Sequence, residues 1–149
     1  MPHSRANALA DEDLRRVYER TKTIAVIGAS ERPGKPAHDI PRYLQTQGYR
    51  IVPVNPRGGE ILGERAFASL SEVDVPFDVV DVFRPPGEAE AVAADAIAVG
   101  AKILWFQPGT DSEAAVRMAV DSGVTVVTDR CMGKAHRELG LGPGPDDED

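Results

Sequence analysis

A glycine turn flanked by small and cationic residues follows the first apolar run of the sequence. The segment TIAVIGASERPGKP contains Gly28, Ala29 and Ser30, and Arg32 and Lys35 come shortly after them. Glycine permits a tight turn, and small neighbours let backbone N–H groups come close to a bound phosphate. The start of the helix that follows also favours negative charge. The segment therefore predicts a phosphate-binding turn at these five residues.

The residue type that would select NAD is missing. A dinucleotide-binding turn is followed about 20 residues later by an Asp or Glu that binds the ribose hydroxyls of NAD. This sequence has Asn55 at that place, with Pro56 and Arg57 behind it. A missing carboxylate and a nearby cation favour a ribose that itself carries a phosphate. NADP and coenzyme A (CoA) are the two common ligands of that kind.

Strand-like and helix-like segments alternate along the chain and would position this turn. Apolar runs predict strands at residues 23–28, 50–55, 77–83, 102–106 and 124–128. Helices are expected at residues 11–20, 36–48, 86–99 and 111–122, and a loop with a small turn and room for a short helix at 56–73. Apolar strands alternating with helices are typical of a parallel sheet that is covered on both faces. We therefore predict an α/β fold, a Rossmann-like, doubly wound, five-stranded parallel sheet in a single domain.

The carboxyl ends of the predicted strands carry a rim of polar and cationic residues. Ligands of open parallel sheets bind outside these ends, where the strand order reverses. Cations follow four of the five strands, and they would repel one another unless an anion lay between them. This predicts a ligand with more than one phosphate, and the alternative is that the cations pair with the acids Glu31, Glu60 and Asp129. The rim consists of Ser30, Arg32, Lys35, Asn55, Pro56, Arg57, Arg84, Gln107, Asp129, Arg130 and Cys131.

Four blocks carry a resemblance to a known family. In unbroken order between about residues 20 and 139 they read AVIGASERPGKPAHDIPRYLQTQGYRIVPVNPRGGEILGERAFASL, DVVDVFRPP, AIAVGAKILWFQPGT and TVVTDRCM. Together they resemble the small stand-alone CoA-binding proteins. That family is similar in fold to the CoA-binding domain of the succinyl-CoA synthetase alpha subunit and of NDP-forming acyl-CoA synthetases. Several blocks in order are far more specific than any one of them.

The resemblance implies coenzyme A as the ligand and a place for each residue of the rim. It implies that the pyrophosphate is surrounded by Gly28, Ala29, Ser30, Arg32 and Lys35. Near the ribose phosphate it places Asn55, Pro56 and Arg57. Bordering the adenine it places Phe83, Arg84 and Pro85. The far wall of the site would be closed by Gln107, Asp129, Arg130 and Cys131.

Other side chains invite a chemical interpretation. Cys131 follows the last strand beside Arg130, which would favour the thiolate that attacks a disulfide, and a buried structural thiol is an equally weighted alternative. His136 could act as a base beside Cys131, but a place on a helix surface is favoured. His38 either contacts the ligand or faces solvent. Trp105, within an apolar strand, is expected in the core.

Composition predicts a soluble, cytoplasmic protein. The 149 residues contain no apolar run near the about 18 residues that a membrane span needs, and residues 1–20 build no secretory signal. The formal net charge of −7 disfavours a nucleic-acid partner. We assign residues 1–20 to an N-terminal helix, 21–140 to the ligand-binding domain and 141–149 to an acidic, disordered tail.

Three functions are compatible with these features. We predict a CoA-binding protein without evident catalytic machinery, which acts as a carrier, sensor or partner of acyl-CoA metabolism. An NADP-dependent oxidoreductase is the second possibility, although no substrate domain or proton relay is recognisable. The third is a subunit of a CoA ligase whose partner chain supplies the phosphohistidine and nucleotide domain. The ligand would be CoA or acyl-CoA, and a protein partner is compatible with each function.

Overall fold

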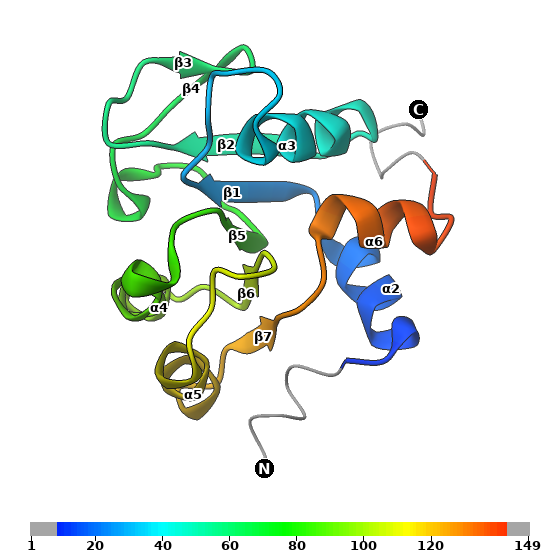
Figure 1. Ribbon diagram of the computed structural model, residues 1–149, viewed down its shortest axis with the longest axis vertical. Coiled ribbons are helices and arrows are strands. Elements are labelled where there is room, and N and C mark those ends of the chain that lie inside the picture. Colours follow the sequence, from blue (N-terminus) through cyan, green and yellow to red (C-terminus); the bar gives the residue numbers. More distant parts are fainter. Residues whose placement is uncertain (1–8, 143–149) are drawn as a thin grey trace.

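Five short apolar runs form one parallel sheet in the computed structural model, which describes residues 9–142 (Figure 1). The strands are β1 (Thr23–Ile27), β2 (Arg50–Val54), β5 (Val79–Val82), β6 (Ile103–Phe106) and β7 (Thr125–Val127). Their order in the sheet is β2-β1-β5-β6-β7, so the chain runs outward from β1 to β2 and then returns to the other side of β1. The order therefore reverses between β1 and β5. The predicted Rossmann-like, doubly wound α/β fold in a single domain is confirmed.

Helices cover both faces of the sheet (Figure 1). One face packs against α2 (Asp11–Arg20), α3 (Pro36–Thr46) and α6 (Met132–Glu138). The other face packs against α4 (Ala89–Ala98) and α5 (Glu113–Asp121). Side chains along each strand alternate between the two cores: in β1, Ile24 and Val26 enter the first core, and Ala25 enters the second. Both faces are buried, which explains why the strands read as continuous apolar runs.

The segment predicted as a loop with a small turn and room for a short helix contains both, and its turn belongs to a short hairpin. It holds the hairpin β3 (Glu60–Ile61) and β4 (Glu64–Arg65) and the 3-10 turn η1 (Leu70–Glu72), and a second 3-10 turn, η2 (Pro86–Glu88), precedes α4. The hairpin turns at Leu62 and Gly63, which have φ of 56° and 76°. Two consecutive positive φ values are usual for a two-residue hairpin turn. Leucine is rare in that conformation, so the sequence does not predict this hairpin.

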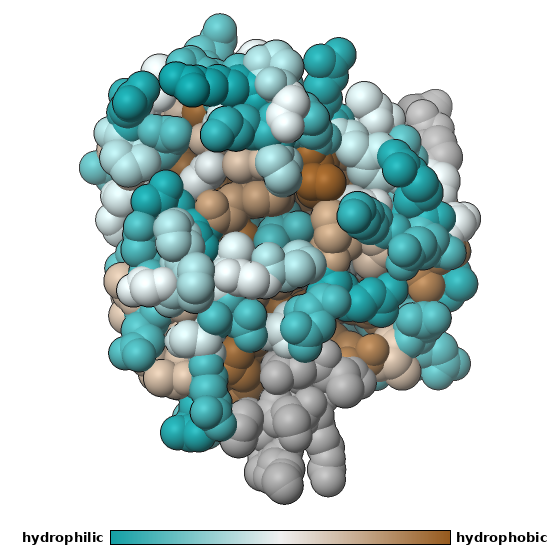
Figure 2. All heavy atoms as spheres, viewed as in Figure 1, coloured by the Kyte–Doolittle hydropathy of each residue, from teal (hydrophilic) through white to brown (hydrophobic). Residues whose placement is uncertain are grey.

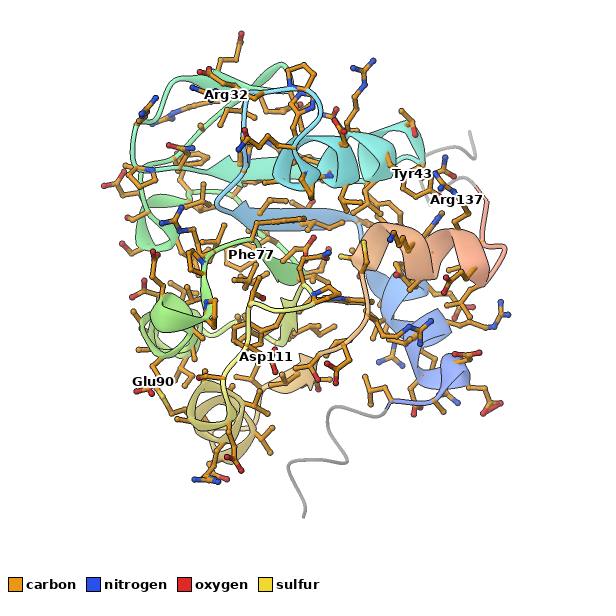
Figure 3. All side chains as sticks on the ribbon, viewed as in Figure 1. Arg32, Tyr43, Phe77, Glu90, Asp111 and Arg137 are labelled. Carbon is orange, nitrogen blue, oxygen red and sulfur yellow. The ribbon has the colours of Figure 1, made fainter. Side chains whose placement is uncertain are left out.

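His136 is buried, which corrects the expectation that it lies on a helix surface. Its side chain is fully enclosed, and its Nδ1 lies 2.8 Å from the Tyr43 hydroxyl oxygen. The rings of Tyr18, Tyr43 and Tyr49 surround the imidazole edge-on, and burial lowers the pKa of His136. Tyr43 and Arg137 come together where α3 meets α6 (Figure 3), with the guanidinium 4.6 Å from the ring centre. The imidazole therefore joins α6 to α2 and α3.

Most of the predicted tail and part of the predicted N-terminal helix lie outside the described residues. The predicted tail lies outside the described residues except for positions 141 and 142, and the first eight residues of the predicted N-terminal helix lie outside as well. Within residues 9–142, no helix has both the length and the apolar character needed to cross a lipid bilayer.

Candidate functional site

The turn after β1 depends on a close approach that only glycine allows. Gly28 has φ of +87°, and a Cβ atom placed on it would lie 2.8 Å from Cδ of Arg84 and 3.0 Å from the carbonyl oxygen of Phe83. Residues other than glycine rarely adopt such a φ. The absence of a side chain therefore brings the β1 turn against the end of β5, at the point where the strand order reverses.

A proline inside α3 shapes the same turn. Pro41 has no N–H, so it cannot complete the helical hydrogen bond to the carbonyl of Ala37. That carbonyl instead accepts a hydrogen bond of 3.1 Å from the N–H of Ser30. The Ser30 hydroxyl accepts another, also 3.1 Å, from the N–H of Arg32. Among the described residues the N–H groups of Ala29, Glu31 and Ala37 find no partner, so they are donors that the turn can offer to an anion.

Asn55 links this turn to the one that follows β2. Its Nδ2 donates to the carbonyl of Ala29 at 2.9 Å, and its Oδ1 accepts from the N–H of Arg57 at 2.8 Å. The predicted ribose-phosphate residue thus uses its side chain to position two loops. Because the Asn55 amide is bonded on both sides, Arg57 is held beside the Gly28 turn.

The two turns enclose a cationic depression, here called the central hollow. Its volume is about 340 Å³. Arg32, Lys35 and Arg57 line it, and none of the three forms an ion pair with another described residue. Figure 3 shows Arg32 on the loop between β1 and α3. In the described part of the chain the alternative of pairing with acids holds for Arg84 and Arg130 of the predicted rim, but not for these three cations. The central hollow can therefore accept an anion. The acid Glu31 also lines it, and the remaining lining residues are Gly28, Ala29, Ser30, Ala37, Asn55, Gly58, Ile61 and Arg84.

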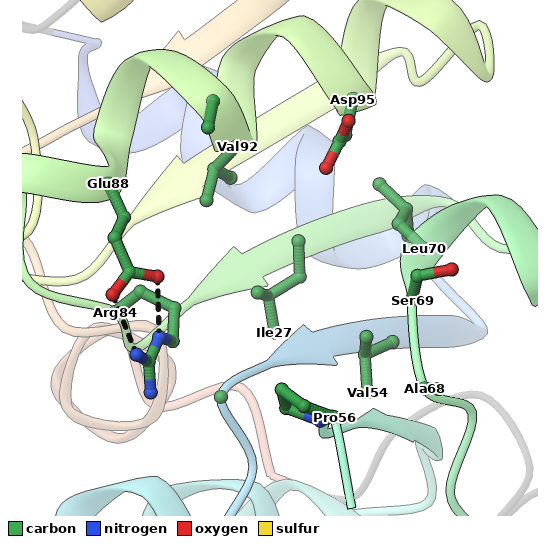
Figure 4. Close-up of a pocket in the computed structure, with 12 residues that line it drawn as sticks. Ile27, Val54, Pro56, Ala68, Ser69, Leu70, Arg84, Glu88, Val92 and Asp95 are labelled. Carbon is green, nitrogen blue, oxygen red and sulfur yellow. Dashed lines mark hydrogen bonds and ion pairs between the residues drawn. The ribbon is translucent and has the colours of Figure 1, made fainter. Parts of the chain in front are cut away.

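Arg84 separates the central hollow from a second, apolar one. Its guanidinium donates to both carboxylate oxygens of Glu88 at 2.9 and 2.7 Å (Figure 4), and this contact lowers the pKa of Glu88. Beyond Arg84 lies the α4 hollow, of about 190 Å³. Aliphatic side chains and Pro56 form most of its wall, and Ser69 and Asp95 bring polar groups to it (Figure 4). The α4 hollow adjoins the central hollow, because Gly28 and Arg84 line both.

A third depression, the α6 hollow, adjoins the central hollow on its other side. Lys35 and Ala37 line both, and the α6 hollow is the largest of the three at about 560 Å³. Apolar surface shows between α3 and α6 on the face seen in Figure 2. Phe83, predicted at the adenine, lies here. Other lining residues are Pro36, Ile40, Gln107, Pro108, Thr110, Cys131 and Lys134. The three hollows form one row along the carboxyl ends of the strands.

Some residues predicted for the site have partners elsewhere. The Arg130 guanidinium lies 3.5 Å from a carboxylate oxygen of Asp11 and 3.7 Å from one of Glu138, so its charge is directed to α2 and α6. The Asp129 carboxylate accepts a hydrogen bond of 3.5 Å from the neighbouring Thr128 hydroxyl, and its φ is 64°. Pro85 caps the 3-10 turn η2.

His38 and Trp105 are both buried. His38 is only 7% exposed, with Nδ1 3.1 Å from an Asp39 carboxylate oxygen, so it does not face solvent. Trp105 is fully buried, as expected.

Sequence reasoning missed Asp81. It lies in β5 between Val26 and Trp105 and is fully buried, and neither carboxylate oxygen has a hydrogen-bond partner among residues 9–142. Burial raises the pKa of Asp81 well above its usual value. An acid within the apolar run FDVVDVF is the signal that could have identified it, because an unpaired carboxylate inside a buried strand is costly.

Comparison with known proteins identifies the family. A family described as a CoA binding domain matches residues 22–137. The chain belongs to that family. Uncharacterized protein YneT of Bacillus subtilis is 39% identical over 124 residues, which are 83% of this chain and 92% of YneT. A solved structure from Thermus thermophilus, cell-free ID.343, has 41% identity and a TM-score of 0.84, covering 88% of this chain and 99% of the other.

A much longer protein shares the CoA binding domain. An ADP-forming acetate–CoA ligase of Archaeoglobus fulgidus is 26% identical over 130 residues, which are 80% of this chain but only 19% of the ligase. The predicted resemblance to CoA-binding proteins is confirmed by these matches. The matched residues 22–137 include all residues that we name in the three hollows.

Proposed function

We propose that this CoA binding domain holds one molecule of CoA or acyl-CoA along the row of three hollows. The observation that carries the proposal is the order of their chemistry: a small apolar hollow, a cationic hollow with free N–H groups, and a larger, mainly apolar hollow. CoA has the same order, with adenine at one end, phosphates in the middle and the pantetheine arm at the other. A single elongated ligand can therefore satisfy all three.

Each part of the ligand meets residues suited to it. The N–H groups of Ala29 and Ala37 and the Lys35 ammonium would bind the pyrophosphate, because such donors favour negative charge. Arg57 would meet the 3′-phosphate on the ribose. The adenine would lie in the α4 hollow against Pro56, and the pantetheine arm would pass Ala37 into the α6 hollow. Asn55 supports this ligand over NAD, because its amide is already bonded and it offers no carboxylate to ribose hydroxyls.

The ligase relative suggests how such a module is used. Because the chain spans 19% of the acetate–CoA ligase that it matches, the reaction named for that protein does not transfer to this one as a whole. We propose a cytoplasmic CoA-holding module that acts as a carrier or sensor, or as a partner of an acyl-CoA enzyme. A ligase subunit that works with a second chain is the other candidate, and the match to the ligase supports it.

CoA is expected to raise the melting temperature more than NAD or NADP at equal concentration. A ligand that binds only the folded state stabilises it by RT ln(1 + [L]/Kd), about 2.7 kcal/mol at 100 times Kd. For a chain of this size that corresponds to roughly 5–10 °C. Thermal denaturation with each ligand measures the shift, and a larger shift with NAD or NADP would contradict the proposed function.

Replacing Arg57 by alanine is expected to remove the preference for the 3′-phosphate. A charge-assisted contact is worth about 1.5–3 kcal/mol, so Arg57→Ala should bind CoA roughly tenfold to hundredfold more weakly. Dephospho-CoA should bind both proteins about equally. Isothermal titration calorimetry provides the affinities, and Arg50→Ala, an exposed arginine at the opposite end of β2, is the matched control. An unchanged ratio of CoA to dephospho-CoA affinity in Arg57→Ala would remove Arg57 from the phosphate site.

A further inference from the structure

The backbone around Cys131 is held by buried side chains. The Trp105 indole N–H donates to the carbonyl of Arg130 at 2.8 Å, and the Tyr18 hydroxyl donates to the carbonyl of Met132 at 2.6 Å. Both rings lie in the core. Cys131 itself is a free, partly exposed cysteine whose side chain lines the α6 hollow. Its neighbours are thus anchored in the core, while Cys131 itself lies at the wall of the hollow.

A buried amide also faces the α6 hollow. Gln107 is only 6% exposed, and its Oε1 accepts a hydrogen bond of 3.0 Å from the N–H of Met132. Its Nε2 has no partner among residues 9–142, although the side chain lines the hollow. The Nε2 atom is not fully buried, so it can donate to an acceptor that a ligand brings into the hollow. The pantetheine arm of CoA carries two amide carbonyls of that kind.

We propose that Cys131 captures CoA as a mixed disulfide, a reversible modification that depends on the proposed CoA site. With the pyrophosphate in the central hollow, the arm runs past Lys35 and Ala37, which line both hollows, and ends with its sulfur in the hollow of Cys131. Gln107 would hold an amide carbonyl of the arm on the way. The thiol of the bound CoA and the thiol of Cys131 would then lie in the same hollow.

The exchange is balanced with CoA disulfide as the oxidant. The Cys131 thiol loses its proton to solvent, and its sulfur attacks one sulfur of CoA disulfide. A protein–CoA disulfide forms as the original sulfur–sulfur bond breaks, and the second CoA leaves as a thiolate that takes up a proton. Cys131 is oxidised and the departing CoA is reduced. A thiol reductant reverses the step.

Intact-mass spectrometry of the full chain with CoA disulfide tests this inference. We expect an adduct of one CoA that dithiothreitol removes and that Cys131→Ser does not form. Glutathione disulfide, at equal concentration, should react at least about tenfold more slowly, because binding raises the local concentration of the CoA reagent. Arg57→Ala should slow the reaction with CoA disulfide and leave that with glutathione disulfide unchanged.

A second measurement separates this inference from the proposed function. Calorimetry of wild-type protein with CoA in dithiothreitol reports non-covalent binding alone. If CoA binds there but CoA disulfide gives no adduct, or reacts no faster than glutathione disulfide, the capture by Cys131 is wrong and the CoA site stands. If CoA does not bind in dithiothreitol, the proposed function and the inference fail together.

Discussion

Gly28→Ala is expected to lower the free energy of unfolding by about 2–5 kcal/mol and to abolish CoA binding. The added methyl group would meet Cδ of Arg84 at 2.8 Å and the backbone of Phe83 at 3.0 Å. Overpacking of this kind costs about 1–3 kcal/mol, and the left-handed conformation adds about 1–2 kcal/mol for a residue with a Cβ. Relief of the contact moves the turn away from β5 and breaks the central hollow. Urea denaturation and calorimetry measure the two effects.

Gly34→Ala is the matched control for the loss of stability; for binding it is not a control, because Gly34 lines the α6 hollow. Gly34 has a similar φ of +95°, but a Cβ there would meet no atom within 4 Å. Only the conformational cost of about 1–2 kcal/mol applies. Equal losses of stability in Gly28→Ala and Gly34→Ala would show that the close approach to β5 is unimportant.

Asp81→Asn is expected to raise the free energy of unfolding, by an amount that grows with pH. Burial raises the pKa of Asp81 in the folded state, so the folded protein keeps a proton that the unfolded chain has lost. The contribution of Asp81 to stability is therefore greatest below the unfolded pKa of about 3.9 and falls as pH rises toward the folded pKa. The loss is about 1.36 kcal/mol for each pH unit in that window. Asparagine does not ionise, so its gain over wild type increases until the folded pKa is reached.

The difference between wild type and Asp81→Asn isolates this group. His136 gives the opposite slope, because burial lowers its pKa and stability is then lost as pH falls below about 6.5. Both proteins contain His136, so its contribution cancels in the difference. Urea denaturation of both at pH 5 and pH 8 provides the comparison. If the free energies of unfolding of the two proteins differ by the same amount at pH 5 and pH 8, Asp81 has the same pKa in the folded and unfolded chains, which contradicts the prediction.

Local patterns predicted the parts of the fold and site that depend on neighbours in sequence. The apolar runs identified all five strands of the sheet, because a strand buried on both faces has few polar positions. Gly28 marked the turn after β1, since a tight turn with close backbone approach requires glycine. The absence of an acid at Asn55 predicts a ligand other than NAD, and the structure adds that the Asn55 amide bonds to the backbone of Ala29 and Arg57.

The same local patterns do not predict contacts between segments that are distant in the sequence. Arg130 pairs with Asp11, more than a hundred residues earlier, so the sequence does not reveal that its charge is directed away from the rim. The burial of His136 depends on tyrosines from other elements. The bond from Ser30 to the carbonyl of Ala37 follows from the missing N–H of Pro41, which is evident only once the turn and helix are seen together.

A crystal structure of the chain with CoA tests the central claim most directly. The account predicts one CoA per chain, with adenine against Pro56 in the α4 hollow and the pyrophosphate within hydrogen-bond distance of the N–H groups of Ala29 and Ala37. The pantetheine arm should reach the α6 hollow, with an amide carbonyl accepting from Nε2 of Gln107. Density for CoA in the reverse direction, or outside these hollows, would contradict it.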